Sequence, residues 1–146
     1  MGEYVNQIDG VVLTPLKIIP NPKGDILHAL KQSDSSFNEF GEVYFSFIHR
    51  DEIKGWKKHT KMTLNIVVPI GEIQFFVYDD REQSETKGKM FNVKLSKNNY
   101  QRLSLSPGLW MAFKGLESDN MLMNFADIEH DSEESINAEL TAFDWN

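Results

Sequence analysis

The stretch GWKKHTKMTLNIVVPIGEIQFFVYDDR, residues 55–81, carries the most information about the fold. It begins with a cluster of lysines around one histidine, His59, and continues with two apolar runs separated by Pro69-Ile70-Gly71. Short apolar runs bounded by proline and glycine are typical of β-strands, and this break predicts a hairpin. Basic and polar side chains at the mouth of a strand pair suit a pocket for an anionic ligand better than they suit a core.

The same alternation of short strands and turns extends over the rest of the chain. Residues 41–49 alternate between two faces, and Asn21-Pro22-Lys23-Gly24-Asp25 is a strong turn signal. Residues 132–140 are compatible with one short helix, with Asp131 or Ser132 as its N-cap. We therefore expect an all-β fold, a small barrel or jelly roll with at most one short C-terminal helix, in a single domain of residues 1–146. Further strand candidates are residues 11–13, 16–19, 26–30, 90–95, 100–105, 110–113 and 121–126.

Composition limits the classes of function. The chain has 146 residues and no cysteine, which excludes disulfides and thiolate metal sites. A net charge of −7 argues against nucleic-acid binding, although a pocket needs only local positive charge. No apolar run approaches the roughly 20 residues of a membrane helix, and the first ten residues lack the features of a signal peptide. We predict a cytoplasmic protein with neither a nucleic-acid nor a membrane partner.

The residues suited to chemistry gather near His59. An imidazole can accept a proton at neutral pH, and lysines can bind a diphosphate or polarise a carbonyl group. The alternatives are a structural histidine and a solvated strand end. Trp56 and Trp110 each lie beside a glycine turn, so they are candidates either for stacking on a sugar or base, or for the core. The lysines concerned are Lys54, Lys57, Lys58 and Lys61.

Several segments together resemble the dTDP-4-dehydrorhamnose 3,5-epimerase family of cupins, over about residues 16–131. The resemblance implies a cupin-like jelly roll, an isomerase acting on a nucleotide-diphosphate sugar, and a homodimer. It also implies that no cofactor is needed, because the ketone of the substrate accepts the electrons. The segments that carry it are residues 22–25, GEVYFSFI, IKGWKKHTKMTLN, VYDDR, NYQRLSLSPGLWMAF and MNFADIEHD.

The resemblance is partial at the catalytic positions. The family's catalytic histidine falls on Lys57, whereas His59 lies where short ketoisomerase-like relatives carry a histidine. The family's catalytic tyrosine has no counterpart, and the region reads NFADI from Asn124. The catalytic candidates are therefore His59, Lys57 and Lys61. The candidates for substrate binding are Lys23, Lys54, Trp56, Tyr44, Asn65, Arg81, Trp110 and Asn124.

The same comparison argues against a metal site. Metal-binding cupins carry two histidines and a glutamate in their first motif and a histidine in their second. Here the first motif reads His59-Thr60-Lys61, and the second histidine position falls on Trp110 or Met111. One donor cannot hold zinc or iron, which need three or more, so we expect no metal.

Three functions remain open at this point. The first is a nucleotide-sugar epimerase that abstracts a proton next to the ketone of a 4-keto-6-deoxy sugar, in surface polysaccharide biosynthesis. The second is a nucleotide-sugar 3,4-ketoisomerase, which the position of His59 and the absent tyrosine suggest. The third is a non-catalytic cupin that binds a nucleotide sugar.

Overall fold

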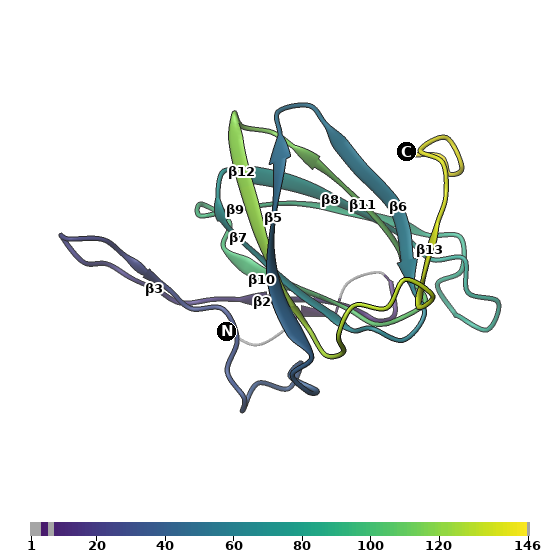
Figure 1. The fold of residues 1–146 in the computed structure, drawn as a ribbon, viewed down its shortest axis with the longest axis horizontal. Helices are drawn as coiled ribbons and strands as arrows, with labels where there is room; N and C mark the ends of the chain where they lie inside the picture. The colour runs from purple at the N-terminus through teal and green to yellow at the C-terminus, as the bar shows by residue number, and fades with distance from the viewer. Residues whose placement is uncertain (1–3, 6–7, 146) are drawn as a thin grey trace.

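The computed structural model describes residues 4–5 and 8–145, and over these residues its regular structure consists of β-strands (Figure 1). The all-β prediction is confirmed. The expected short helix at residues 132–140 is not formed, because this segment makes a turn and then a strand that pairs with residues 57–59. None of the elements in this part of the chain is a helix long and apolar enough to span a bilayer.

Within the described residues the chain forms thirteen strands, and the two longest connections are residues 28–41 and 79–89. Their bounds are β1 (Tyr4–Val5), β2 (Val11–Pro15), β3 (Ile18–Ile19), β4 (Ile26–Leu27), β5 (Glu42–His49), β6 (Ile53–His59), β7 (Leu64–Ile70), β8 (Glu72–Tyr78), β9 (Met90–Ser96), β10 (Gln101–Leu105), β11 (Trp110–Gly115), β12 (Asp119–Ala126) and β13 (Ser135–Asn137).

Two antiparallel sheets face each other and enclose the core. One has six strands in the order β1-β2-β10-β7-β12-β5, and the other has five in the order β13-β6-β11-β8-β9. Strands β3 and β4 form a separate hairpin, which projects from the barrel as an arm (Figure 1). Alternate side chains of each strand point between the sheets, as Ile73, Phe75 and Val77 of β8 do, and all three are fully buried. This is the layout of a jelly roll.

The predicted hairpin between residues 62–68 and 72–78 is wrong in its pairing. Strand β7 pairs with β10 and β12, whereas β8 pairs with β11 and β9 in the other sheet. Between them Gly71 has a φ of +76°, and a Cβ there would lie 2.2 Å from the Asp119 carbonyl oxygen. The chain therefore crosses from one sheet to the other at a position that only glycine fits.

A second apolar cluster covers the outer face of the five-stranded sheet. The C-terminal residues Phe143 and Trp145 pack there, with ring centroids 5.3 and 4.6 Å from that of the buried Trp56. The backbone of Trp56 also exchanges hydrogen bonds with that of Ala138. Together these contacts hold the C-terminal segment, including β13, against β6. Tyr78, Phe76 and Trp110 complete the cluster.

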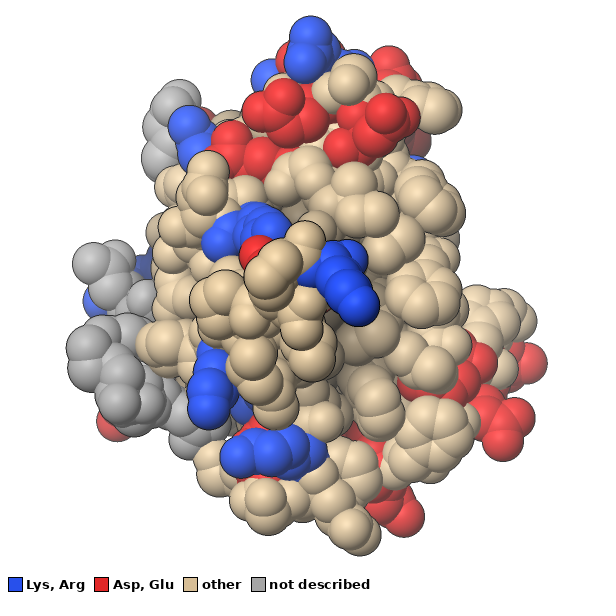
Figure 2. Space-filling model, turned by 90° about the vertical axis from the view of Figure 1, so that its left-hand side faces the viewer, with Lys and Arg blue, Asp and Glu red and all other residues tan. Residues whose placement is uncertain are grey.

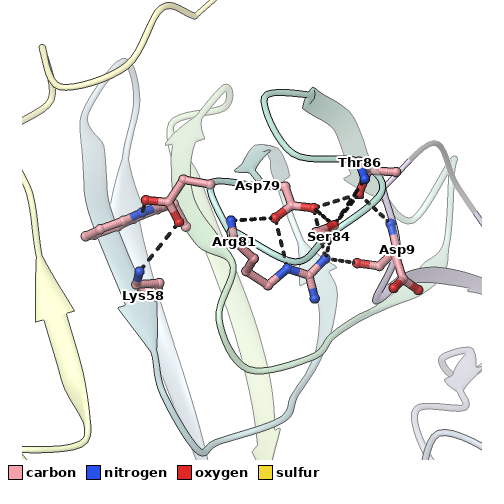
Figure 3. Close-up of polar contacts among 8 residues, drawn as sticks. Asp9, Lys58, Asp79, Arg81, Ser84 and Thr86 are labelled. Atoms are coloured by element: carbon pink, nitrogen blue, oxygen red, sulfur yellow. Dashed lines mark hydrogen bonds and ion pairs between the residues drawn. The ribbon is translucent and has the colours of Figure 1, made fainter.

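A buried carboxylate organises the loop after β8 (Figure 3). Asp79 is fully buried and accepts hydrogen bonds from the Arg81 guanidinium at 2.9 Å and from the Ser84 and Thr86 hydroxyls at 2.6 Å. Arg81 also donates to the carbonyl oxygen of Asp9. Burial acts to raise the pKa of Asp79, but these hydrogen bonds outweigh it and hold that pKa far below its usual value.

Substitution of Asp79 by alanine should destabilise the fold. It leaves the Arg81 guanidinium and two hydroxyls without their acceptor, so we expect the free energy of unfolding to fall by about 3 kcal/mol. Denaturant unfolding followed by tryptophan fluorescence measures this change. Glu82→Ala is the matched control, because its exposed pair with Lys87 should contribute below about 1 kcal/mol.

The contribution of Asp79 to the free energy of unfolding should also decrease as the pH is lowered. Its pKa is lower in the folded than in the unfolded state, where it is about 3.9. The stabilisation is therefore complete above that value and is lost as the pH falls below it. The difference in unfolding free energy between the natural chain and Asp79→Ala should shrink below about pH 4. A difference that grows on acidification would contradict the assignment.

Candidate active site

A cavity of about 740 Å³ lies between the two sheets, and this volume is typical of small-molecule sites. Its apolar lining comes mainly from β7, β11 and β12. Its polar lining comes mainly from β5, β6 and β13, so the reactive groups gather on the side where the edges of the two sheets face each other. The polar residues are Glu42, Tyr44, Ser46, Lys54, Lys57, His59, Asn124, His130 and Asn137.

The alternation of β6 decides which of its side chains reach the cavity. Lys57 and His59 are two residues apart and share the inner face. Lys58, between them, points outward, where its Nζ lies 4.9 Å from the Trp110 ring centroid and 3.5 Å from an Asp80 carboxylate oxygen. Lys57 and Lys58 of the lysine cluster therefore lie on opposite faces of β6, and Lys61 lies beyond the end of the strand.

His59 forms a close pair with a carboxylate from the C-terminal strand region. Its Nδ1 lies 2.8 Å from Oε1 of Glu134, and both side chains are largely buried. A neutral imidazole that donates from Nδ1 to a carboxylate carries its lone pair on Nε2. With Nδ1 occupied in this way, Nε2 is the nitrogen left to accept a proton in the cavity.

Glu134 also fixes the turn that follows β6. Its Oε2 accepts hydrogen bonds from the backbone N–H groups of Lys61 at 2.9 Å and of Met62 at 2.8 Å. Burial acts to raise the pKa of Glu134, but the hydrogen bonds from His59 and from these two N–H groups outweigh it, so the pKa lies below its usual value. Glu134 is therefore ionised at neutral pH and holds His59 in one orientation.

No local sequence pattern marks Glu134 as a site residue. It lies 75 residues from His59, in an acidic segment for which a helix was expected. Pairing of β13 with β6 brings it to the site, with Ser135 opposite His59 and Asn137 opposite Lys57. Only knowledge of this long-range pairing identifies the residue.

Two further contacts join the walls of the cavity. Lys54 on β6 donates to the Phe47 carbonyl oxygen at 2.7 Å and to the Ser46 hydroxyl at 3.2 Å, so its charge bridges to β5. On the other wall, the Asn124 side-chain amide donates to the Tyr44 hydroxyl at 3.0 Å. These three hydrogen bonds, two from Lys54 and one from Asn124, fix polar atoms on both sides of the cavity.

Five of the candidates from the sequence therefore come together at the cavity: Tyr44, Lys54, Lys57, His59 and Asn124. Lys23 does not join them, because it lies exposed in the turn between β3 and β4, on the projecting arm.

The other five candidates lie away from the cavity lining. Trp56 and Trp110 belong to the aromatic cluster on the outer face of the sheet, so they pack in a core rather than on a cavity ligand. Arg81 is engaged with Asp79 in the loop after β8. The Asn65 side chain is buried against the Ser104 hydroxyl and the Ser36 carbonyl oxygen. Lys61 is exposed, and its backbone N–H meets Glu134.

Within residues 4–5 and 8–145, no three histidine, aspartate or glutamate side chains are grouped so that they could hold a metal ion.

Comparison with known proteins gives a consistent result. The family model for dTDP-4-dehydrorhamnose 3,5-epimerase matches residues 6–145. The structure of a dTDP sugar isomerase from Desulfovibrio desulfuricans superposes with a TM-score of 0.94 at 34% identity, covering 97% of this chain and 94% of that one.

Two curated relatives belong to glycan pathways. A probable low-salt glycan biosynthesis epimerase of Haloferax volcanii is 24% identical over 95% of both chains. The spore coat polysaccharide biosynthesis protein SpsL of Bacillus subtilis is 26% identical over 75% of this chain and 72% of its own.

The contacts of Glu134 lead to a prediction about stability. Glu134→Ala removes the acceptor of two backbone N–H groups and of His59, one of them at the buried Met62, so unfolding free energy should fall by about 2 kcal/mol. Denaturant unfolding is again the measurement. The control is Glu133→Ala, whose exposed side chain should leave stability within about 0.5 kcal/mol. Equal effects of the two substitutions would argue against the role of the Glu134 carboxylate.

Proposed function

The chain belongs to the dTDP-4-dehydrorhamnose 3,5-epimerase family, and we propose that it epimerises a nucleotide-diphosphate 4-keto-6-deoxy sugar by removing a proton next to the ketone. The observation that carries this proposal is the His59–Glu134 pair at a cavity that also contains Lys57. Proton abstraction beside a carbonyl needs a positioned base and a cation near the developing oxyanion, and these residues are of that kind.

The first step follows from the geometry of this pair. The lone pair on Nε2 of His59 takes the proton from the carbon beside the ketone, and the C–H electrons form the enolate. The positive charge of Lys57 stabilises the enolate oxygen, because it lines the same cavity from the same strand. Lys61 is a weaker candidate for this role, since it does not line the cavity.

Glu134 acts as a positioning residue in this scheme. Its ionised carboxylate stabilises the imidazolium that forms when His59 accepts a proton, as the buried acid does in other carboxylate–histidine pairs. Its bonds to the N–H groups of Lys61 and Met62 keep it in place without moving during the reaction. The base is therefore oriented before the substrate arrives.

The outer face of the six-stranded sheet supports a homodimer. The β5 side chains Phe45 and Phe47 are 61% and 63% exposed, and Phe40 just before the strand is 62% exposed. Beside them on β12 lie Met121 and Phe125, which are half-buried. An apolar surface of this kind is rare on a monomer, and a second copy of this chain is the occupant we assign to it.

The arm adds positive charge outside the barrel. Residues 16–31 carry three exposed lysines, Lys17, Lys23 and Lys31, on a chain of net negative charge. Figure 2 looks at the molecule from the side of the arm, and shows lysine and arginine side chains over the middle and lower part of this face and at its top edge. Acidic side chains lie near the top and towards the lower right. Since Lys23 does not line its own cavity, its predicted phosphate contact is to a ligand bound by the second copy.

The pathway and compartment form part of the same proposal. The curated relatives take part in glycan and polysaccharide biosynthesis, which supports a role in making a surface polysaccharide. We assign the reaction to the cytoplasm, because a chain without cysteines needs no oxidising compartment to fold.

The decisive experiment is solvent exchange. The protein is incubated with dTDP-4-keto-6-deoxyglucose in D₂O, and the sugar protons are followed by NMR. We expect deuterium at C3 or C5 together with a change of configuration at the labelled carbon. A ketone moved to C3 would instead identify a ketoisomerase. Binding in calorimetry without any exchange would contradict the epimerase and leave a nucleotide-sugar-binding protein.

His59→Ala should lower the rate of that exchange by at least about 10²-fold, the usual contribution of a general base. The matched control is His49→Ala, whose exposed histidine does not line the cavity and should leave the rate unchanged. Circular dichroism checks that both variants fold. Undiminished exchange in His59→Ala would remove this residue from the mechanism.

The dimer is tested by molecular mass in solution. Light scattering should give the mass of two chains for the natural protein and of one chain for Phe47→Asp, because a carboxylate buried in an apolar interface is costly. Ile136→Asp is the control, since Ile136 is also an exposed apolar residue but lies on the other sheet. A natural protein with the mass of one chain would overturn the proposed interface.

A further inference from the structure

Epimerisation needs a proton donor that faces the base across the substrate. The proton must leave from one face of the sugar carbon and return to the other. His59 and Lys57 are both on β6, so they act from the same wall of the cavity. The region where the resemblance places the family's tyrosine reads NFADI, residues 124–128, and contains no tyrosine. Asn124 of this region lines the cavity, but its amide is not an acid. The inference below rests on the proposed function and concerns the missing donor.

The opposite wall contains a hydroxyl beside Asn124. Tyr44 on β5 is the direct cross-strand partner of Asn124 on β12, and both side chains line the cavity. The two strands belong to the six-stranded sheet, whereas His59 belongs to the five-stranded sheet. A ligand in the cavity therefore has the imidazole on one side and the phenol on the other.

The orientation of the Asn124 amide determines where the Tyr44 proton points. The backbone N–H of Asn65, which can only donate, lies 3.1 Å from Oδ1 of Asn124. The amide oxygen is thereby identified, and the amide nitrogen is the atom that lies 3.0 Å from the Tyr44 oxygen. Because an amide N–H₂ group donates, the Tyr44 oxygen accepts this bond, and its own hydrogen is not used by Asn124.

We propose that Tyr44 is the general acid, which donates its phenolic proton to the enolate carbon from the face opposite His59. It occupies the chemical role of the family's tyrosine from a neighbouring strand. Tyr44 is 39% exposed, so its ring stands at the open side of the cavity, where water can return a proton to the phenolate.

Chemistry favours Tyr44 over the other β5 groups. Ser46 also lines the cavity, but an alcohol is a far weaker acid than a phenol, and its oxygen already accepts a bond from Lys54. Burial raises the pKa of Tyr44, and the negative charges of Glu42 and Glu134 add to this, while the bond from Asn124 opposes it. The phenol therefore keeps its proton at neutral pH, as a general acid must before it donates that proton. Glu42 remains the competing donor on this strand, and the experiment includes it.

The step conserves atoms and electrons. His59 takes a proton from the carbon, and the C–H electron pair forms the enolate double bond while the carbonyl electrons move to oxygen. The enolate then reforms the ketone, and its carbon bonds to the proton of the Tyr44 O–H group. Water re-protonates the phenolate and takes the proton from the imidazolium, so no oxidant or cofactor is consumed.

The test separates proton removal from inversion. Tyr44→Phe and the natural protein are incubated with dTDP-4-keto-6-deoxyglucose in D₂O, and NMR measures both deuterium incorporation and the new epimer. Tyr44→Phe should still exchange, within about tenfold of the natural rate, because His59 can return a solvent deuteron to the same face. The epimer should fall by at least about 10²-fold. Tyr78→Phe is the control, since Tyr78 packs in the outer cluster and should change neither.

Two further variants sharpen the result. Asn124→Asp replaces the donating amide by an accepting carboxylate, so the Tyr44 proton is drawn away from the cavity and epimer should be lost relative to exchange. Glu42→Gln should leave the ratio of epimer to exchange unchanged. Loss of epimer in Glu42→Gln rather than in Tyr44→Phe would overturn the proposal.

Two other outcomes would overturn the role of Tyr44, and a third would overturn the proposed function itself. If Tyr44→Phe keeps both exchange and inversion, Tyr44 is not the donor, and the proposed function stands. If it loses both while calorimetry shows that it still binds the nucleotide sugar, Tyr44 acts in proton removal and not as the returning acid. If the natural protein itself shows no exchange, the proposed function has failed, independently of Tyr44.

Discussion

The geometry of the site depends on the hydrogen bonds that the Glu134 carboxylate accepts. This carboxylate joins three parts of the molecule that are distant in sequence: the C-terminal segment, the turn after β6, and the imidazole of His59. Buried carboxylates are costly unless their oxygens are satisfied, and here each oxygen has a donor. The same requirement that stabilises the charge therefore also orients the histidine. Structure and reactivity are coupled through one side chain.

The aromatic cluster outside the five-stranded sheet keeps that carboxylate in place. Strand β13 has only three residues and pairs with β6 alone, so the ladder by itself is weak. Phe143 and Trp145, further along the chain, bury their rings against Trp56 and so hold the segment down. This explains why Trp56 and Trp110, which stand beside glycine turns in the sequence, belong to a core. Their neighbours in sequence resemble those of ligand-stacking residues, and only the C-terminal residues reveal the difference.

The sequence predicted the strands much better than their partners. Alternating apolar residues predicted β5, β8, β9 and β10 nearly to the residue, and in β8 the alternation matches a single buried face. The sequence did not predict β6 as a strand. One face of β6 lines the cavity and the other meets the aromatic cluster, but its lysines interrupt the apolar alternation by which a strand is recognised. The local sequence could not show that β7 and β8 pair with other strands and not with each other, because the chain crosses from one sheet to the other at Gly71. Glu134 could not be identified for the same reason: nothing local marks a residue whose partner lies 75 positions away.

The proposed catalytic residues lie at other positions than the family resemblance predicts, and strand geometry explains how they still reach the cavity. A histidine moved by two residues along a strand stays on the same face, because side chains alternate with a period of two. His59 therefore reaches the same cavity as Lys57, which places a lysine on the same strand face as the proposed base. Tyr44 on β5 is the cross-strand partner of Asn124 on β12, about one strand spacing or roughly 5 Å away, and it lines the same cavity. In the proposed mechanism the base His59 belongs to one sheet and the acid Tyr44 to the other. Inversion requires the two groups to act from opposite walls of the cavity, and this pair meets that requirement.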